Sequence, residues 1–158
     1  MVYELDNIRH GETMKTYFYI KLNTKLPELV EKIKNSYKKN LMAVVLFGSA
    51  ARGDFSQSSD IDLLLILKDS VESKRKRILD FYEKIGYEFE NHFLSPLILT
   101  QEELKDFLSF YVGILKDCKV LYDNSNVVRE LIEMIDKRKQ KKEIIEKEFK
   151  GTTYWIIK

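Results

Sequence analysis

Two apolar runs joined by a polar loop constrain this chain more than any other feature of its sequence. The first run, Leu41–Phe47, ends at Gly48, and the second, Ile61–Leu67, is entered through Asp60 and carries Asp62 as its second residue. Apolar runs of this length between turn residues are typical of buried strands. The sequence therefore predicts two core strands with a polar, ligand-accessible loop between them.

Two carboxylates mark the start of the second run. Asp60 and Asp62 would lie on one face of a strand, with Cα atoms roughly 6.5 Å apart. This spacing suits two divalent cations about 3.5–4 Å apart, as in phosphoryl transfer. A solvated strand end is the alternative, but two acids beside an apolar run are costly without a cation. Gly48 lets a ligand approach the backbone, and Ser49 with the following amides can face phosphate oxygens.

Together these residues resemble a family signature. Gly48-Ser49, ten further residues and Asp60-Ile61-Asp62 are similar to the Gly-Ser…Asp-x-Asp pattern of the DNA polymerase β superfamily of nucleotidyltransferases. Ala51-Arg52-Gly53 and Ser59 extend the resemblance, which is strongest to the minimal nucleotidyltransferases that accompany HEPN-domain proteins. It is firm over residues 41–68 and looser to residue 123. It implies an α/β (α+β) fold, with a small mixed sheet backed by helices.

The resemblance also implies an activity. The chain would move a nucleoside monophosphate from ATP or another NTP to an acceptor hydroxyl, with release of pyrophosphate, and the acceptor would belong to a HEPN-type partner protein. Asp60 and Asp62 would bind two Mg²⁺ ions. The nucleotide would be contacted by Gly48, Ser49, Arg52 and Ser59. For Arg52, a surface ion pair with Asp54 is the alternative.

A third carboxylate is harder to identify. In the superfamily it often lies on a strand beside the Asp-x-Asp strand and can act as general base. Residues 87–99 predict that strand, with a bend near Pro96, yet contain no aspartate. We expect Glu90 to be the catalytic acid rather than Glu88, because it lies nearer the apolar centre of the strand; an exposed edge glutamate is the alternative. The other polar candidates are Asn91, His92 and Ser95, and without a carboxylate His92 or solvent would take the proton.

Two other function classes remain open. The uncertain third carboxylate and the aromatic N-terminus favour a degenerate, antitoxin-like module that binds a nucleotide or a partner without turnover. A small-molecule transferase resembling the antibiotic nucleotidyltransferases would need a larger acceptor-binding region than this sequence provides. Transfer of label from an NTP separates the enzymes from the binding module.

Composition limits the broad class. The chain has 158 residues, of which 44% are hydrophobic and 33% charged, and a net charge of +2. We expect one domain over residues 1–158, with a core of about 26–123 and an extension over 124–158. The charge is too small to indicate general nucleic-acid binding and leaves that partner uncertain. The single cysteine indicates the reducing cytoplasm, and no segment predicts a membrane span. The oligomeric state is open, with a homo-oligomer as one expectation.

The remaining elements follow from periodicity and capping residues. Helices are predicted over residues 26–40, 71–85, 104–115 and 127–149, and strands over 119–123 and 152–157. Pro27 suits the first turn of the first helix. In the second helix Val71 and Leu79 are among the residues expected to point inward, and Gly86 would end it. A capping box, Thr100–Glu103, would open the third helix. The last strand would extend a sheet edge or pair with another subunit. Residues 1–24 are expected to cover the core, with a partner surface as the alternative. The basic runs 72–77 and 136–142 are expected to be solvated helix faces or, in the second case, a bend; binding of an acidic or nucleic-acid partner is the alternative.

Overall fold

The computed structural model describes residues 10–106 and 108–158. In chain order its first half contains α1 (His10–Tyr37), η1 (Lys38–Asn40), β1 (Leu41–Phe47), α2 (Ser49–Arg52), β2 (Ile61–Leu67), α3 (Lys74–Ile85) and β3 (Glu88–Phe89). The second half contains β4 (His92–Thr100), η2 (Glu103–Lys105), α4 (Leu108–Leu115), β5 (Lys119–Asp123), α5 (Val127–Gln140), β6 (Ile144–Phe149) and β7 (Thr152–Ile157).

The central sheet is mixed and has the strand order β3-β4-β2-β1-β5. β1 pairs antiparallel with β2 and β5, β3 pairs antiparallel with β4, and β2 pairs parallel with β4. The predicted α+β class and the bounds of both core strands are confirmed. β1 and β2 lie in the middle of the sheet and are buried on both faces, which explains why their sequences are continuous apolar runs.

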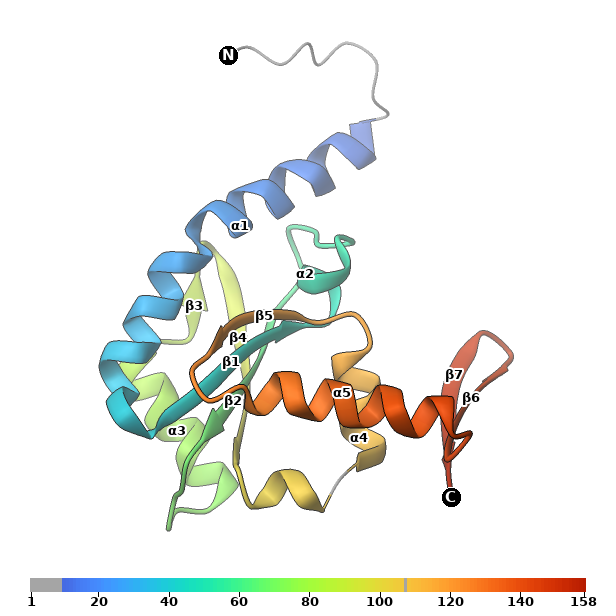
Figure 1. Cartoon of the computed structure of the whole chain (residues 1–158). Coiled ribbons are helices and arrows are strands. Elements are labelled where there is room, and N and C mark those ends of the chain that lie inside the picture. Colours follow the sequence, from blue (N-terminus) through green and yellow to red (C-terminus); the bar gives the residue numbers. More distant parts are fainter. Residues whose placement is uncertain (1–9, 107) are drawn as a thin grey trace.

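Helices cover both faces of the sheet (Figure 1). α1 and α3 pack on one face around a cluster that includes Leu29, Leu63 and Phe81. α4, α5 and the separate β6–β7 hairpin pack on the other face around Leu64, Tyr111 and Val128. α2 lies at one end of the sheet, on the same side as the projecting part of α1. No helix within the described residues is long and apolar enough to cross a membrane.

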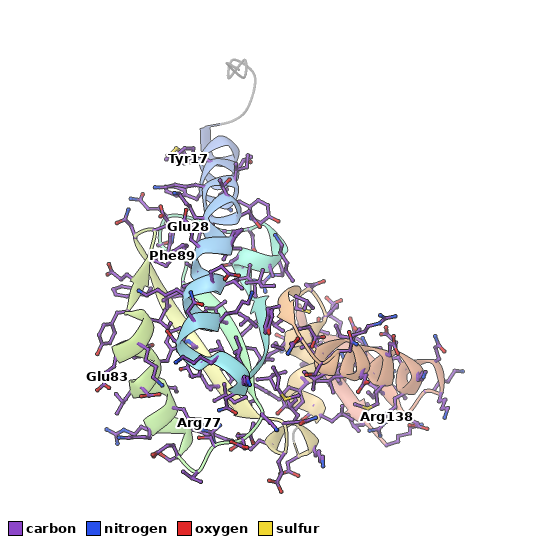
Figure 2. The ribbon with its side chains drawn as sticks, turned by 60° about the vertical axis from the view of Figure 1, so that its left-hand side comes forward. Tyr17, Glu28, Arg77, Glu83, Phe89 and Arg138 are labelled. Carbon is purple, nitrogen blue, oxygen red and sulfur yellow. The ribbon has the colours of Figure 1, made fainter. Side chains whose placement is uncertain are left out.

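The first helix is longer than predicted. α1 runs through Pro27, which was expected in the first turn, so the proline interrupts one backbone hydrogen bond of a continuing helix. In the segment before it, Leu22 is buried, whereas Tyr17 and Ile20 are exposed. Figure 2 shows Tyr17 on the part of α1 that extends beyond the sheet. The expectation that this segment covers the core is therefore right for one side of the helix only, and Tyr3 lies outside the described residues.

The helix predicted over residues 127–149 is confirmed as far as Gln140 and wrong beyond it. α5 ends at Gln140, and β6 then pairs antiparallel with β7 of the same chain rather than extending the helix. The terminal strand is present, but within the chain it pairs with β6 and does not extend the central sheet; pairing with another subunit stays a prediction. Trp155 explains this arrangement, because its ring lies so close to Gly113 of α4 that a Cβ there would be 3.1 Å away. A tertiary contact thus outweighs the helical pattern of residues 141–149.

The helix predicted over residues 71–85 begins later. Ser73 caps α3 by accepting a hydrogen bond from the Lys76 amide at 3.2 Å, and Gly86 ends the helix, as predicted. Val71 and Leu79, which were expected to point inward, are exposed. The basic run is also not wholly a solvated face. Arg77 is only 6% exposed and lies beneath β4.

Arg77 connects α3 to the capping box that follows β4. Its Nη1 and Nη2 donate to the two Glu103 carboxylate oxygens, each at 2.8 Å, and Nη1 also donates to the Ile98 carbonyl at 2.9 Å. Glu103 accepts from the Thr100 amide at 2.8 Å and its own amide donates to Thr100 Oγ1 at 3.3 Å. The predicted capping box is confirmed, although it opens the short η2 instead of the full helix.

Candidate functional site

The centre of the candidate site is the contact between Asp62 and Gly48. Asp62 pairs across the sheet with Phe47, the last residue of β1, and Gly48 follows it with φ +69°. A Cβ at Gly48 would overlap Asp62 Oδ2 and lie 3.2 Å from its Cγ. Ser49 then begins α2, where the Ala51 and Arg52 amides donate to the Gly48 carbonyl. The glycine therefore lets the carboxylate lie against the backbone turn.

Three neighbouring side chains affect the pKa of Asp62. Burial is the main cause that raises its pKa, and the hydrogen bond from Ser95 acts in the opposite direction. The negative charge of Asp60 raises the pKa of Asp62 further, and the positive charge of Arg52 lowers it. The structure thus brings Asp60, Asp62 and Arg52 together with Gly48, as the sequence predicted, and adds Ser95.

Ser95 reaches the site through strand pairing. In the parallel pair of β2 and β4, Asp62 lies opposite Ser95 and Ile61 opposite Leu94. The place beside Asp62 on the neighbouring strand is therefore occupied by an uncharged hydroxyl. In the sequence Ser95 was one of several polar candidates, and only the register of β4 distinguishes it from the others.

The predicted strand over residues 87–99 is in fact a hairpin. Glu90 and Asn91 both have positive φ, at 50° and 64°, and form the two-residue turn between β3 and β4. Glu90 lies in this turn, where its carboxylate pairs with Lys21 of α1 at 3.5 Å. It is not at the apolar centre of a strand, and its role as third carboxylate stays a prediction.

His92 supports the loop that leads to Asp60. Its Nδ1 lies 2.9 Å from the Ser59 carbonyl, and its ring packs against Phe55 with centroids 4.4 Å apart. The Ser59 hydroxyl accepts from the Ser56 amide at 3.0 Å, so in this structure it stabilises the loop. His92 is 5% exposed, which makes it a buried structural histidine and not an accessible base.

Three further side chains have structural roles. Arg52 pairs with Asp54 at 3.5 Å, the alternative considered for it, although its charge also acts on Asp62. Tyr111 is fully buried and donates to the Glu103 carbonyl at 3.2 Å, so it belongs to the core. Burial raises the pKa of the Cys118 thiol, in agreement with an unreactive side chain.

The carboxylate pair fits a divalent cation. Within residues 10–106 and 108–158 no group of three or more His, Cys, Asp or Glu side chains could hold a metal. Mg²⁺, however, is commonly bound by one or two carboxylates together with water and substrate phosphates. Burial against the Gly48 turn and the charge of Asp60 raise the pKa of Asp62, and a bound cation would favour its ionised form.

If the chain performs the nucleotidyl transfer that its sequence resemblance implies, Gly48→Ala is expected to reduce the rate at least about tenfold, because displacing a carboxylate by 1 Å can cost still more. The new methyl group would collide with Asp62, and the positive φ would add strain. Gly53→Ala is the matched control, since Gly53 also has positive φ, at 87°, but nothing lies within 4 Å of its Cβ position. Rates and thermal unfolding would be measured for both; equal activities would contradict the proposed contact.

Comparison with known proteins points to one family. The family described as "Polymerase beta, Nucleotidyltransferase" matches residues 31–127. "Putative protein adenylyltransferase MJ1305" of Methanocaldococcus jannaschii is 32% identical over 123 residues, which cover 72% of this chain and 80% of the relative. A second protein of that organism with the same designation, MJ0604, is 30% identical over 100 residues, covering 61% and 94% of the two chains.

A solved structure of a "putative nucleotidyltransferase" from Sulfolobus solfataricus aligns with a TM-score of 0.49 and 23% identity, covering 75% of this chain and 92% of the other. This similarity is too distant to bear on activity. The family match spans both core strands and the whole Gly48–Asp62 site. The chain therefore belongs to the polymerase β family of nucleotidyltransferases.

Proposed function

We propose that this protein transfers AMP from ATP to a hydroxyl group of a partner protein. The observation that carries the proposal is the Asp62 carboxylate, which lies against the Gly48 turn with the negative charge of Asp60 nearby, in a chain of this family. The choice of AMP and of a protein acceptor is supported by the designation of the M. jannaschii relatives as protein adenylyltransferases. A HEPN-type toxin is the partner implied by the sequence resemblance.

In this proposal two groups of residues bind different parts of the Mg·ATP substrate. Gly48 and Ser49 would hold the β- and γ-phosphates, with Arg52 as a further cationic contact, and Asp60 and Asp62 would hold Mg²⁺. A bound metal would neutralise part of the phosphate charge and would make the acceptor hydroxyl easier to deprotonate. The acceptor oxygen forms a bond to the α-phosphorus, the bond to pyrophosphate breaks, and the hydroxyl proton passes to water.

A specific observation favours a second candidate. The position beside Asp62 on β4 carries Ser95 rather than an acid, so no carboxylate base is provided there. A module that binds Mg·ATP and a partner without turnover would tolerate this arrangement. Such a protein would bind nucleotide but release neither pyrophosphate nor a labelled product.

Radiolabel transfer tests the proposal. The purified chain would be incubated with α-³²P-ATP and MgCl₂, alone and with extract of the native source, with the other labelled NTPs in parallel. We expect label on a polypeptide, and no label with the Asp60→Ala/Asp62→Ala variant. Nucleotide binding without transfer would favour the binding module, and label on a small molecule would indicate a different acceptor class.

A further inference from the structure

An exposed phenylalanine lies next to the carboxylate pair and has no role in the core. Phe93 is 62% exposed, and along β4 it alternates with the buried residues His92 and Leu94. Since side chains on a strand point to alternate faces, Phe93 shares the face of Ser95. Since single exposed apolar side chains are ordinary on protein surfaces, it is the position of Phe93 beside the carboxylate pair that points to a contact with a ligand.

Strand register places Phe93 close to Asp60. Asp62 pairs with Ser95 and Ile61 with Leu94 in the parallel pair of β2 and β4. Asp60 precedes Ile61 and Phe93 precedes Leu94, so both residues lie at the end of the sheet that carries Asp62 and Ser95. Glu88 of β3 is the cross-strand partner of Phe93 on its other side.

The direction of nucleophilic attack on the α-phosphorus determines whether the acceptor or the pyrophosphate lies on the β4 side of Asp62. In phosphoryl transfer the attacking and leaving oxygens are roughly in line, on opposite sides of the phosphorus. In the sheet, β2 separates β1, which leads into Gly48, from β4. If pyrophosphate leaves on the Gly48 side of Asp62, the nucleophile must approach from the opposite side, over Ser95 and Phe93.

We infer that the exposed face of Phe93 and Ser95 is the acceptor subsite of this protein. Its ligand is the hydroxyl-bearing residue of the acceptor polypeptide, with Phe93 packing against the apolar part of that residue and its neighbours. Ser95, uncharged and exposed, lies at the place where the hydroxyl enters. This inference rests on the proposed function, since it assigns the acceptor side of the same reaction.

Phe93→Ala and Phe149→Ala form a matched pair for the test. Phe149 is 64% exposed and lies at the end of the β6–β7 hairpin, so its truncation removes the same side chain from an equally exposed position of another sheet. Two probes would be used with each full-length variant. One is the nonhydrolysable ATP analogue AMPCPP with MgCl₂, and the other is the polypeptide that the wild type labels in extract, after purification.

Phe93→Ala should lower kcat/KM for the labelled polypeptide about tenfold, the effect of losing roughly 1.4 kcal/mol of contact in the transition state. Its affinity for Mg·AMPCPP should stay within about twofold of the wild type, and Phe93→Leu should recover part of the transfer rate. Phe149→Ala should match the wild type in both measurements.

Two results would overturn the assignment while leaving the proposed function intact. Unchanged transfer by Phe93→Ala would show that the acceptor does not contact this face. Weakened Mg·AMPCPP binding would show that Phe93 contacts the nucleotide and not the acceptor. If the wild type labels no polypeptide at all, the proposed function is wrong, and the assignment of the acceptor subsite is then wrong as well.

Discussion

Asp62→Asn should abolish nucleotidyl transfer and at the same time stabilise the folded protein. In the proposed function this charge would hold the metal–nucleotide complex, so its loss should reduce the rate at least about 10³-fold. The gain in stability follows from the environment of the carboxylate, which is partly buried against Gly48 and close to the negative charge of Asp60. Functional sites often retain such unfavourable groups, and relieving one commonly adds about 0.5–2 kcal/mol.

The pH dependence gives this prediction a definite sign. Because folding raises the pKa of Asp62 above its ordinary value of 3.8, ionisation costs more free energy in the folded protein than in the unfolded chain. The stabilising effect of asparagine should therefore be fully present at pH 7 and should shrink as the pH falls through the raised pKa. Thermal unfolding without divalent ions, from pH 7 to pH 3, would measure it.

Asp54→Asn is the control for Asp62→Asn. Asp54 is an exposed acid of the same loop and pairs with Arg52, so its neutralisation should change transfer and stability little. An Asp62→Asn protein that is active, or that unfolds below the wild type at pH 7, would show that this carboxylate is neither a metal ligand nor a destabilising charge.

Glu103→Ala should cause the largest loss of stability among single substitutions of charged residues outside the site. It would leave the Arg77 guanidinium, which is only 6% exposed, without the carboxylate that pairs with it twice at 2.8 Å. Breaking a buried pair by removing one partner typically costs about 3–5 kcal/mol. The free energy of unfolding in urea at pH 7 would test this, with Glu102→Ala as the exposed neighbouring control.

The same pair predicts a loss of stability in acid. The hydrogen bond from Arg77 lowers the pKa of Glu103 to about 2, from an ordinary value of 4.5. Its contribution should be complete above about pH 4.5 and should be lost as the pH falls toward 2. Arg77→Met/Glu103→Leu should restore much of the stability lost in Glu103→Ala, since an apolar pair needs no compensation. Equal unfolding free energies for the wild type and Glu103→Ala would contradict the buried-pair account.

The two core strands and the position of the acids at the start of the second strand could be predicted because their pattern is local. Leu41–Phe47 and Ile61–Leu67 are apolar without interruption, and strands buried on both faces have this pattern wherever they occur. The strands end or begin at Gly48, Asp60 and Asp62, so predicting the strands also predicts that these three residues lie near one end of the sheet. The Thr100–Glu103 capping box and the Gly86 helix end were equally local and equally predictable.

The wrong predictions share a different cause. Residues 141–149 suit a helix as well as a strand, and the contact of Trp155 with Gly113, more than forty residues away in sequence, favours the hairpin. The basic run containing Arg77 looks solvated until Glu103 is brought beside it. Glu90 was expected within a strand because Glu-Asn is an uncommon sequence for a two-residue turn with positive φ at both positions.

By itself, the sequence determined the strand–loop–strand unit, the acids that it carries and the family to which the chain belongs. Only the tertiary structure decided that Ser95 lies beside Asp62, that Phe93 is exposed next to it, and that His92 supports the loop before Asp60. The physical reason is that the register of β4 against β2 joins residues some thirty positions apart. Such a pairing depends on how α3 and the β3–β4 turn pack, and no local pattern of side chains contains that information.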